Sequence, residues 1–373
     1  MNRCLRAGTG LIVAMLCGAA LAGPLPDYKV VPVLTLAPGG DRLVPRAINN
    51  RGDVLGIRSG WGTAAFVGRG GTPSWLPSLG GIDTNGGDIN DAGDVAYAAA
   101  TAEGGMHAAL YRNGQVVDLA PLPRLSSSAG AISASGRFIV GDTSCAGCAP
   151  NAAGFDGRGG LVDPGTLGGG SRAWDVNDAG QAVGIAYRDG DPAPRAFLSQ
   201  NGVMTDLGDF GGNNAGAVAI NGAGVVAGGA DDANHLSHAF LYRDGAMIDL
   251  GTLYPNRSTA ATALNDTGMV VGIGTYASIS DTAFVWRDGV MMDLNALLDP
   301  ASGWRIDDAR GINDIGQIAA HGCNAGLGVC GVLRLDPLVP VPEPGTVAML
   351  AAGLAGLALL ALSEMAGRRG RVA

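Results

Sequence analysis

The most constraining feature of this sequence is a short phrase that occurs seven times. In its clearest copy, Val176–Gly184, an aliphatic residue precedes Asn-Asp-x-Gly, and an apolar run that ends in glycine follows. The other copies begin at Ile48, Ile89, Ile132, Ile220, Leu264 and Ile312, so successive copies start 41 to 48 residues apart. A fixed period of this length indicates an array or a closed propeller rather than one conventional core.

Each repeat divides into four short strands at its turn signals. In one copy, strands are predicted at residues 173–177, 181–187, 195–199 and 203–210. Asn-Asp-x-Gly separates the first two strands, and Asn201-Gly202 is a hairpin signal between the last two. The 63 glycines and the low charged content of 15% suit short strands joined by turns. Four strands in roughly 44 residues is the size of a propeller blade.

The two ends of the repeat region predict that the ring closes. The seventh repeat stops after its third strand, Val332–Leu335, and Tyr28–Leu36 reads like an unattached fourth strand. An open solenoid would leave two bare sheet edges without caps. We therefore expect an all-β, seven-bladed propeller of four-stranded blades, closed by the N-terminal strand. Small residues precede the Asn-Asp-x-Gly turns and fit inner strands crowded near an axis: Ala131, Ala219, Ala263 and Gly311.

Both ends of the chain carry processing signals around a repeat body at residues 23–340. Residues 1–22 form a signal peptide, with Arg3 and Arg6 before the apolar stretch Leu11–Leu21 and a small-x-small cleavage site. At the other end, Gly345–Ser363 lacks any charge and, as a helix, would span roughly 28 Å, enough to cross a bilayer. The basic cluster Arg368, Arg369 and Arg371 follows and places that end in the cytoplasm.

Residues 341–373 resemble a PEP-CTERM sorting signal. The resemblance rests on Val341, Pro342, Glu343 and Pro344, followed by the apolar helix and the basic cluster. It implies an exosortase-type processing enzyme as partner in a Gram-negative bacterium that makes exopolysaccharide. It also implies anchoring in the inner membrane before sorting, then removal of the helix and transfer to the cell surface or extracellular matrix. A permanent single-span anchor is the alternative interpretation.

The third-strand phrases resemble the HAF repeats of extracellular proteins. His238-Ala239-Phe240 matches the family phrase letter for letter. Most other copies depart at the first position, with Ala64, Ala153, Arg195, Thr282 and Cys330. The resemblance covers nearly all of residues 23–340 and implies export and a repeat fold, but no chemistry.

The four cysteines of the repeat region predict two disulfides. An exported protein resides in an oxidising compartment, where paired cysteines are the rule. We expect Cys323 to bond to Cys330 across one hairpin and Cys145 to bond to Cys148. A four-Cys zinc site is disfavoured, because the two pairs belong to blades three and seven, nearly opposite each other in the ring.

Metal, cofactor and nucleic-acid chemistry are not predicted. The Asn-Asp-x-Gly turns suggest calcium loops, but each supplies only one or two oxygen ligands, and hairpin chemistry explains them. A transition-metal site within Asp231–His238 is disfavoured, because no other copy supplies a comparable cluster. The formal charge of −9 includes +4 from residues 1–22 and 345–373, which leaves −13 for residues 23–344. Such an acidic body does not suit binding to nucleic acid or anionic lipid.

The sequence favours a non-enzymatic surface or biofilm-matrix protein that binds polysaccharide or protein. No Gly-x-Ser-x-Gly, His-Glu-x-x-His or phosphate loop is present. The alternative is a propeller enzyme that acts on extracellular glycans with acids from distant loops. Because binding residues concentrate on variable loops of a rigid scaffold, we expect the ligand on the face that carries the loops between second and third strands. The candidate residues there are Arg188, Asp189, Asp191, Asp231, Asp232 and His235.

Overall fold

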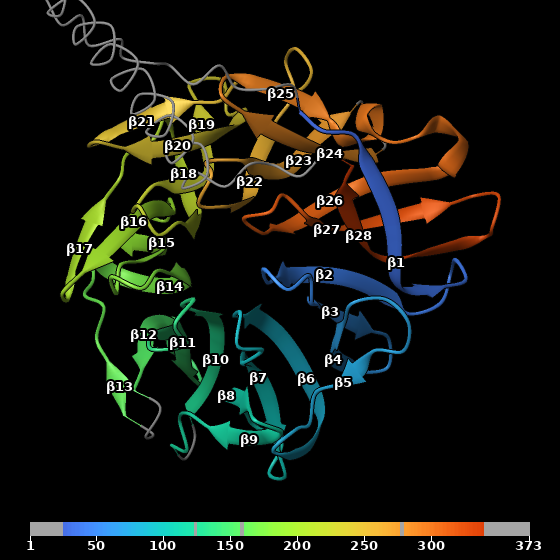
Figure 1. Cartoon of the computed structure of the whole chain (residues 1–373). Coiled ribbons are helices and arrows are strands. Elements are labelled where there is room, and N and C mark those ends of the chain that lie inside the picture. The colour runs from blue at the N-terminus through green and yellow to red at the C-terminus, as the bar shows by residue number, and fades with distance from the viewer. Residues whose placement is uncertain (1–24, 123–124, 157–159, 277–279, 339–373) are drawn as a thin grey trace, which may run out of the picture.

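Seven antiparallel sheets of four strands surround a central opening (Figure 1). The computed structural model describes residues 25–122, 125–156, 160–276 and 280–338. Within these ranges, the helices are short 3-10 turns, and none is long and apolar enough to cross a membrane. The predicted seven-bladed propeller of four-stranded blades is therefore confirmed.

Each blade runs from an inner strand at the axis to an outer strand at the rim. The first blade consists of β2 (Arg42–Ile48), β3 (Val54–Ser59), β4 (Thr63–Gly68) and β5 (Ser74–Trp75). The second consists of β6 (Gly80–Ile89), β7 (Val95–Thr101), β8 (Met106–Arg112) and β9 (Gln115–Asp118). The third consists of β10 (Leu125–Ile132), β11 (Ile139–Cys145), β12 (Asn151–Phe155) and β13 (Leu161–Val162). The fourth blade consists of β14 (Gly168–Val176), β15 (Ala182–Arg188), β16 (Arg195–Gln200) and β17 (Val203–Asp206). The fifth consists of β18 (Gly211–Ile220), β19 (Val226–Asp232), β20 (Ser237–Arg243) and β21 (Ala246–Asp249). The sixth is β22 (Thr259–Leu264), β23 (Val270–Tyr276), β24 (Ser280–Arg287) and β25 (Val290–Asp293), and the 3-10 helices η2 (Leu294–Leu297) and η3 (Pro300–Ser302) follow it. The seventh is β26 (Trp304–Ile312), β27 (Ile318–Asn324), β28 (Val329–Pro337) and β1 (Tyr28–Leu36).

The seventh blade is completed by the start of the chain, as predicted. β1 lies antiparallel to β28, with Tyr28 opposite Pro337 and Leu36 opposite Cys330. In Figure 1 the blue β1 lies at the rim beside the red end of the ribbon. This pairing covers the edge of β28 and joins the two ends of the repeat region.

The phenylalanines of the third strands explain why the apolar runs of the second strands end in glycine. Phe66 and Phe240 are fully buried, and each lies opposite a glycine of the neighbouring strand. A Cβ atom at Gly56 would lie 2.5 Å from the ring of Phe66, and one at Gly228 would lie 2.7 Å from the ring of Phe240. The ring therefore occupies the space that a side chain at Gly56 would need, and at Gly228 the backbone carbonyl of Gly216 lies closer still than the ring.

The hydrophobic core lies in layers between adjacent blades. One such layer joins Ala227 and Leu241 of the fifth blade to Val270 and Phe284 of the sixth. Equivalent layers repeat around the ring. Neighbouring blades therefore share one core, which makes the ring a rigid support for its two faces.

Candidate functional site: the central channel

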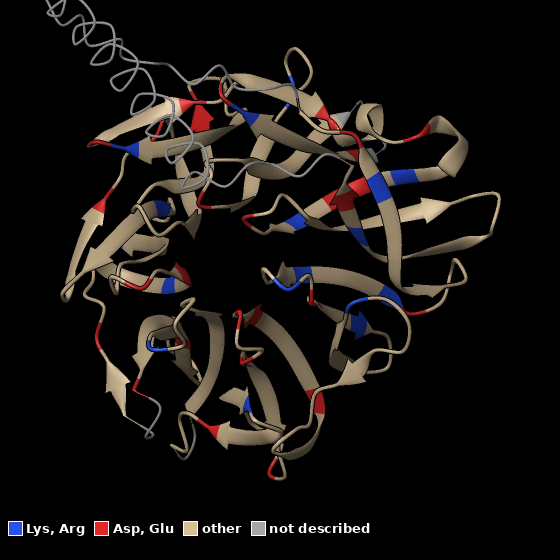
Figure 2. Cartoon of the chain, viewed as in Figure 1, with Lys and Arg blue, Asp and Glu red and all other residues tan. Residues whose placement is uncertain are grey.

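A channel runs along the axis between the inner strands of the seven blades. We call the end at the Asn-Asp-x-Gly turns the turn face, and the end with the loops between second and third strands the loop face. Three cavities follow one another and share lining residues: 230 Å³ at the turn face, 190 Å³ in the middle and 490 Å³ at the loop face. Charged ribbon segments of both signs surround this opening (Figure 2).

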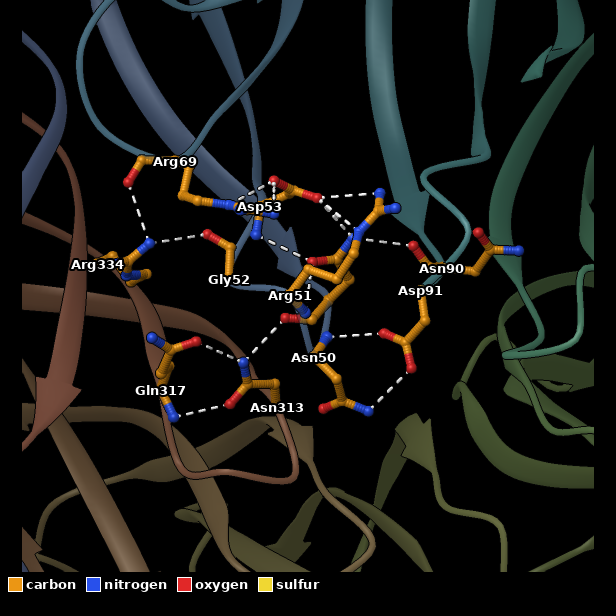
Figure 3. A network of polar contacts seen from close by, with 11 residues as sticks. Asn50, Arg51, Gly52, Asp53, Arg69, Asn90, Asp91, Asn313, Gln317 and Arg334 are labelled. Carbon is orange, nitrogen blue, oxygen red and sulfur yellow. Dashed lines mark hydrogen bonds and ion pairs between the residues drawn. The ribbon is translucent and has the colours of Figure 1, made fainter. Parts of the chain in front are cut away.

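At the turn face, the first asparagine of the turn links its blade to the next one in five of the seven blades. The Oδ1 atom of Asn221 accepts hydrogen bonds from the N–H groups of Ala223 and Val225 within its own turn. Its Nδ2 atom donates to the carbonyl of Asn265 in the next blade at 3.3 Å. Figure 3 shows the same bond where the ring closes, from Asn313 to Asn49 at 2.9 Å. We call these buried residues the asparagine ring: Asn49, Asn90, Asn177, Asn221, Asn265 and Asn313.

The second residue of the turn forms a further belt around the axis. Asp91 accepts hydrogen bonds from the backbone N–H and the side-chain amide of Asn50, at 2.7 and 3.0 Å (Figure 3). Asp266 accepts the N–H of Gly222 at 2.7 Å, and Asp314 accepts the N–H of Asp266 at 2.9 Å. These carboxylates therefore join neighbouring blades. No group of three or more His, Cys, Asp or Glu side chains within the described ranges is arranged to hold a metal ion.

Every inner strand contains a β-bulge at the same place in the repeat. In the first blade Pro45 lies opposite Gly56 and Ala47 opposite Leu55, so Arg46 is the extra residue. The register shifts at the equivalent place in the other six blades. The seven extra residues all line the middle and loop-face cavities: Arg46, Gly87, Gly130, Trp174, Val218, Thr262 and Arg310. Bulges re-aim side chains and are common beside functional sites.

Two carboxyl groups lie in the middle of the channel, one residue after a bulge. Each carboxyl group connects two blades, because Asp88 accepts the N–H groups of Ile89 and Ile132, and Asp175 accepts those of Val176 and Ile220. Burial raises the pKa of Asp88 to about 6. Burial, and then the negative charge of Asp88, raise the pKa of Asp175 to about 8. Near pH 7 the Asp175 carboxyl is therefore mostly protonated while that of Asp88 is mostly ionised.

Two arginines and a tryptophan dominate the mouth of the channel at the loop face. Arg46 and Arg310 are bulge residues of blades one and seven, which are neighbours in the ring. Asp308 binds the Nε atom of Arg310 with both carboxylate oxygens at 2.9 Å. Trp174, 38% exposed, lines the same cavity from blade four. This mouth carries more varied chemistry than any other part of the channel.

The predicted loop residues of blade four are engaged within their own blade. Arg188 forms an ion pair with Asp206 at 2.7 Å. Asp191 accepts the N–H of Ala193 at 3.0 Å and lies 3.5 Å from Arg195. Asp189 is exposed to solvent. The ends of this loop are therefore held by polar contacts, and its tip remains open.

The predicted residues of blade five shape the neighbouring loop. Asp232 accepts the N–H groups of Asn234 and Leu236, at 2.8 and 2.9 Å. The N–H of Leu236 is the main cause that holds the pKa of Asp232 below its usual range. Asp231 accepts the amide of Asn214, and His235 is exposed at a positive φ of 59°. Among the described contacts, none joins these residues to Arg188, Asp189 or Asp191 of blade four.

The cysteines form two local crosslinks in the structure. Cys145 is bonded to Cys148, and Cys323 is bonded to Cys330. Cys323 and Cys330 lie directly opposite each other in β27 and β28. The sorting motif from Val341 to Pro344 and the basic cluster at Arg368, Arg369 and Arg371 lie outside the described residues.

The histidine of the third-strand phrase has a partner in the fourth strand of its blade. Nδ1 of His238 lies 2.9 Å from Asp249, and Nδ1 of His107 lies 2.8 Å from Asp118. In both blades the pair ties the third strand to the outer strand at the loop face. A structural role therefore accounts for this histidine.

Sequence reasoning missed the central channel, although one signal was available. Aligning the seven copies on their first aliphatic residue places all seven bulge residues two positions before it. That column contains Arg, Gly, Gly, Trp, Val, Thr and Arg, while the column before it holds only Pro, Gly and Ala. Such variation at one position of otherwise similar copies indicates that packing does not dictate the residue there, as is expected where side chains line an open channel.

Comparison with known proteins agrees with the fold and with the sorting signal. Residues 340–369 match the PEP-CTERM protein-sorting motif, which implies an exported protein that exosortase sorts to the surface. No curated protein matches the chain significantly.

Solved structures at low identity share the propeller architecture. The β-propeller domain of the Trilobed protease from Pyrococcus furiosus is 11% identical, with a TM-score of 0.53 over 83% of this chain and 98% of that domain. Its propeller is described as having an open velcro topology, whereas β1 closes the ring here. The acylaminoacyl peptidase from Pyrococcus horikoshii is also 11% identical, with a TM-score of 0.51 over 75% of this chain and 49% of that one. At this identity the likeness shows the fold alone.

Proposed function

We propose that this chain is a non-enzymatic binding scaffold of the bacterial cell surface or biofilm matrix, delivered there by exosortase. The observation that carries the proposal is a closed, rigid propeller placed ahead of a PEP-CTERM sorting motif. The resemblance of the third-strand phrases to HAF repeats supports the same location. We propose that the chain is anchored in the inner membrane before sorting, and that its partner is exopolysaccharide or a matrix protein.

The hydrogen-bonding pattern favours binding over catalysis. At the turn face five side chains of the asparagine ring, all except that of Asn90, and the carboxylates of Asp91, Asp266 and Asp314 are engaged between blades. On the loop face, loops of two neighbouring blades differ in sequence on a fixed frame, which is where binding residues concentrate. We therefore assign the ligand to the loop face.

One observation favours the alternative of a propeller enzyme that acts on glycans. Asp88 and Asp175 lie in the same channel with unequal pKa values of about 6 and about 8. Glycoside hydrolases use two carboxyl groups whose pKa values differ. Against it, each carboxyl group already accepts two backbone N–H groups in contacts that join blades.

The test compares glycan binding with glycan turnover by the full-length protein in detergent. An array of the producer's own matrix polysaccharides measures binding, and chromatography of the same glycans after incubation measures cleavage. Binding without shortened products is expected. Shortened products that disappear in the Asp88→Ala or Asp175→Ala variant would establish the enzyme instead.

A second comparison locates the ligand on one face. Six loop residues are replaced together by Ala or Ser: Arg188, Asp189, Asp191, Asp231, Asp232 and His235. The matched control is Asp244→Asn with Asp288→Asn, at hairpin tips on the turn face where positive φ values of 54° and 49° suit asparagine. Weaker attachment to the matrix is expected only for the loop variant. Unchanged attachment there, with a loss in the control, would move the ligand to the turn face.

A further inference from the structure

The bulge residues are the place where the seven copies differ most in chemistry near the axis. The residues just before the bulges are all small, from Pro45 in blade one to Ala309 in blade seven. The bulges themselves place two guanidinium groups and one indole in the 490 Å³ cavity at the loop face. Small-ligand sites have volumes of about 300–1,000 Å³. The cavity therefore has the size of such a site and an uneven distribution of functional groups around it.

Arg46 has an unmet capacity to bind an anion. Burial and then the nearby charge of Arg310 lower the pKa of Arg46, and the charge of Asp308 offsets this only in part. Within the described residues, its Nε atom is buried without an acceptor, and its guanidinium forms no ion pair. Its hydrogen bond is a 3.3 Å contact with the amide oxygen of Asn85. A carboxylate at this position would accept the free N–H and offset the repulsion from Arg310.

Arg310 differs from Arg46 because an acid already holds it. Asp308 lies 2.9 Å from its Nε atom and neutralises part of its charge. Arg310 therefore adds positive potential at the mouth, while Arg46 still has an N–H group available to donate a hydrogen bond to a ligand. A single carboxylate matches this pair better than a group with several charges would.

The opposite side of the mouth suits the apolar face of a sugar ring. Among the seven bulge residues only Trp174 is aromatic, and this residue is 38% exposed. Gly87 and Gly130 contribute no side chains, which leaves the cavity open between the indole and Arg46. Ser128, hydrogen-bonded to Asp142 at 3.0 Å, adds hydroxyl and carboxylate groups at the wall. A flat apolar surface with nearby polar groups fits a ligand that has an apolar face and polar substituents.

We propose that the loop-face mouth of the channel binds one acidic sugar residue of a glycan. Arg46 holds the sugar carboxylate, Arg310 adds positive potential, and Trp174 stacks against the ring. The net charge of −9 opposes a long run of anionic residues, so the bound residue is a chain end or a branch. This inference rests on the proposed function and names the ligand class and the subsite.

The test uses full-length protein in detergent with a glucuronate-terminated disaccharide, and its glucose-terminated counterpart as the neutral probe. Isothermal titration calorimetry is expected to detect the acidic sugar and to show at least tenfold weaker binding of the neutral one. Arg46→Gln is expected to weaken binding of the acidic sugar at least tenfold, and Trp174→Val is expected to weaken both sugars. Arg46→Lys, which keeps a charge but lacks the planar fork, should fall between wild type and Arg46→Gln.

Arg51→Gln is the matched control, because Arg51 belongs to the same blade and forms an ion pair with Asp53 at the turn face. It should leave the affinity unchanged, and melting temperatures close to wild type would show that the variants are folded. Equal affinity for the two sugars, or full affinity in Arg46→Gln, would overturn the assignment. Failure to bind the acidic sugar while the array binds other glycans would overturn this subsite and leave the proposed function intact. Failure to bind any glycan or matrix protein would overturn both.

Discussion

Replacing Asn221 by Ala tests how strongly the asparagine ring holds neighbouring blades together. Asn221 is only 6% exposed, and its side chain makes three hydrogen bonds. The Oδ1 atom accepts from Ala223 at 3.1 Å and Val225 at 3.0 Å, and the Nδ2 atom donates to Asn265 at 3.3 Å. At about 1 kcal/mol for each bond, the variant should lose about 3 kcal/mol of the free energy of unfolding.

The assay is thermal unfolding of the full-length protein followed by circular dichroism. At about 2 °C per kcal/mol for a protein of this size, the melting temperature should fall by roughly 6 °C. Asn221→Ser should cost less, because blade three naturally carries the buried Ser133, whose hydroxyl accepts the N–H of Phe138 at 3.3 Å. Asn151→Ala, at an exposed strand position, is the control and should stay within about 0.5 kcal/mol of wild type. A loss in Asn221→Ala no larger than in this control would show that the asparagine ring does not hold the blades together.

The closing strand, the buried carboxyl group of Asp175 and one disulfide each give a further prediction. Deleting residues 25–36 should destabilise the full chain strongly and promote association, because β28 would become an open edge; an unchanged melting temperature and a monomeric profile on size-exclusion chromatography would contradict this. Burial raises the pKa of Asp175 to about 8 from an ordinary value near 3.9, so its stabilising contribution is complete below about pH 4 and is lost as pH rises to about 8. Wild type should therefore lose stability relative to Asp175→Ala between pH 5 and pH 8 in parallel melts, and a constant difference would show that this carboxyl group does not titrate abnormally. Cys323→Ser with Cys330→Ser should lower the melting temperature only modestly, because the loop that the disulfide closes is short, and a fall above about 10 °C would contradict this.

The fold could be predicted from the sequence because its signals repeat. In each copy the Asn-Asp-x-Gly turn and the later hairpin turn predicted four strands, and the missing strand after Val332–Leu335 pointed to Tyr28–Leu36 as its replacement. The Asn-Gly turn at residues 201 and 202 adopts the positive φ values of 53° and 77° that its residues favour. The turn residues, the number of strands per copy and the closure of the ring therefore all pointed to the same fold, and such agreement makes a prediction reliable.

The channel could not be predicted from local patterns. A bulge adds one residue to a strand without a sequence signature of its own. In a strand as rich in Ala and Gly as β18, the alternation of polar and apolar residues does not reveal which side chains point to the channel. Asn221 lies in a turn that the sequence predicted, but the bond from its amide to Asn265 joins positions 44 residues apart and depends on the ring geometry. The interior position of Trp174 likewise follows only from the closed ring.

The six loop residues remain a prediction. The structure places them on two neighbouring loops, where several of their polar groups are engaged in loop contacts. Asp189 and His235, both exposed, are the members most open to a ligand. They lie on the same face as the mouth of the channel, so a larger glycan held at Arg46 could extend toward them.

A crystal structure of the full-length protein soaked with the glucuronate-terminated disaccharide would show whether the loop-face mouth binds an acidic sugar without cleaving it. We expect electron density for an intact disaccharide in the loop-face mouth, with its carboxylate against Arg46 and its ring on Trp174. Density for a cleaved sugar beside Asp88 and Asp175 would contradict the non-enzymatic function. Density confined to the turn face would contradict the assignment of the binding face.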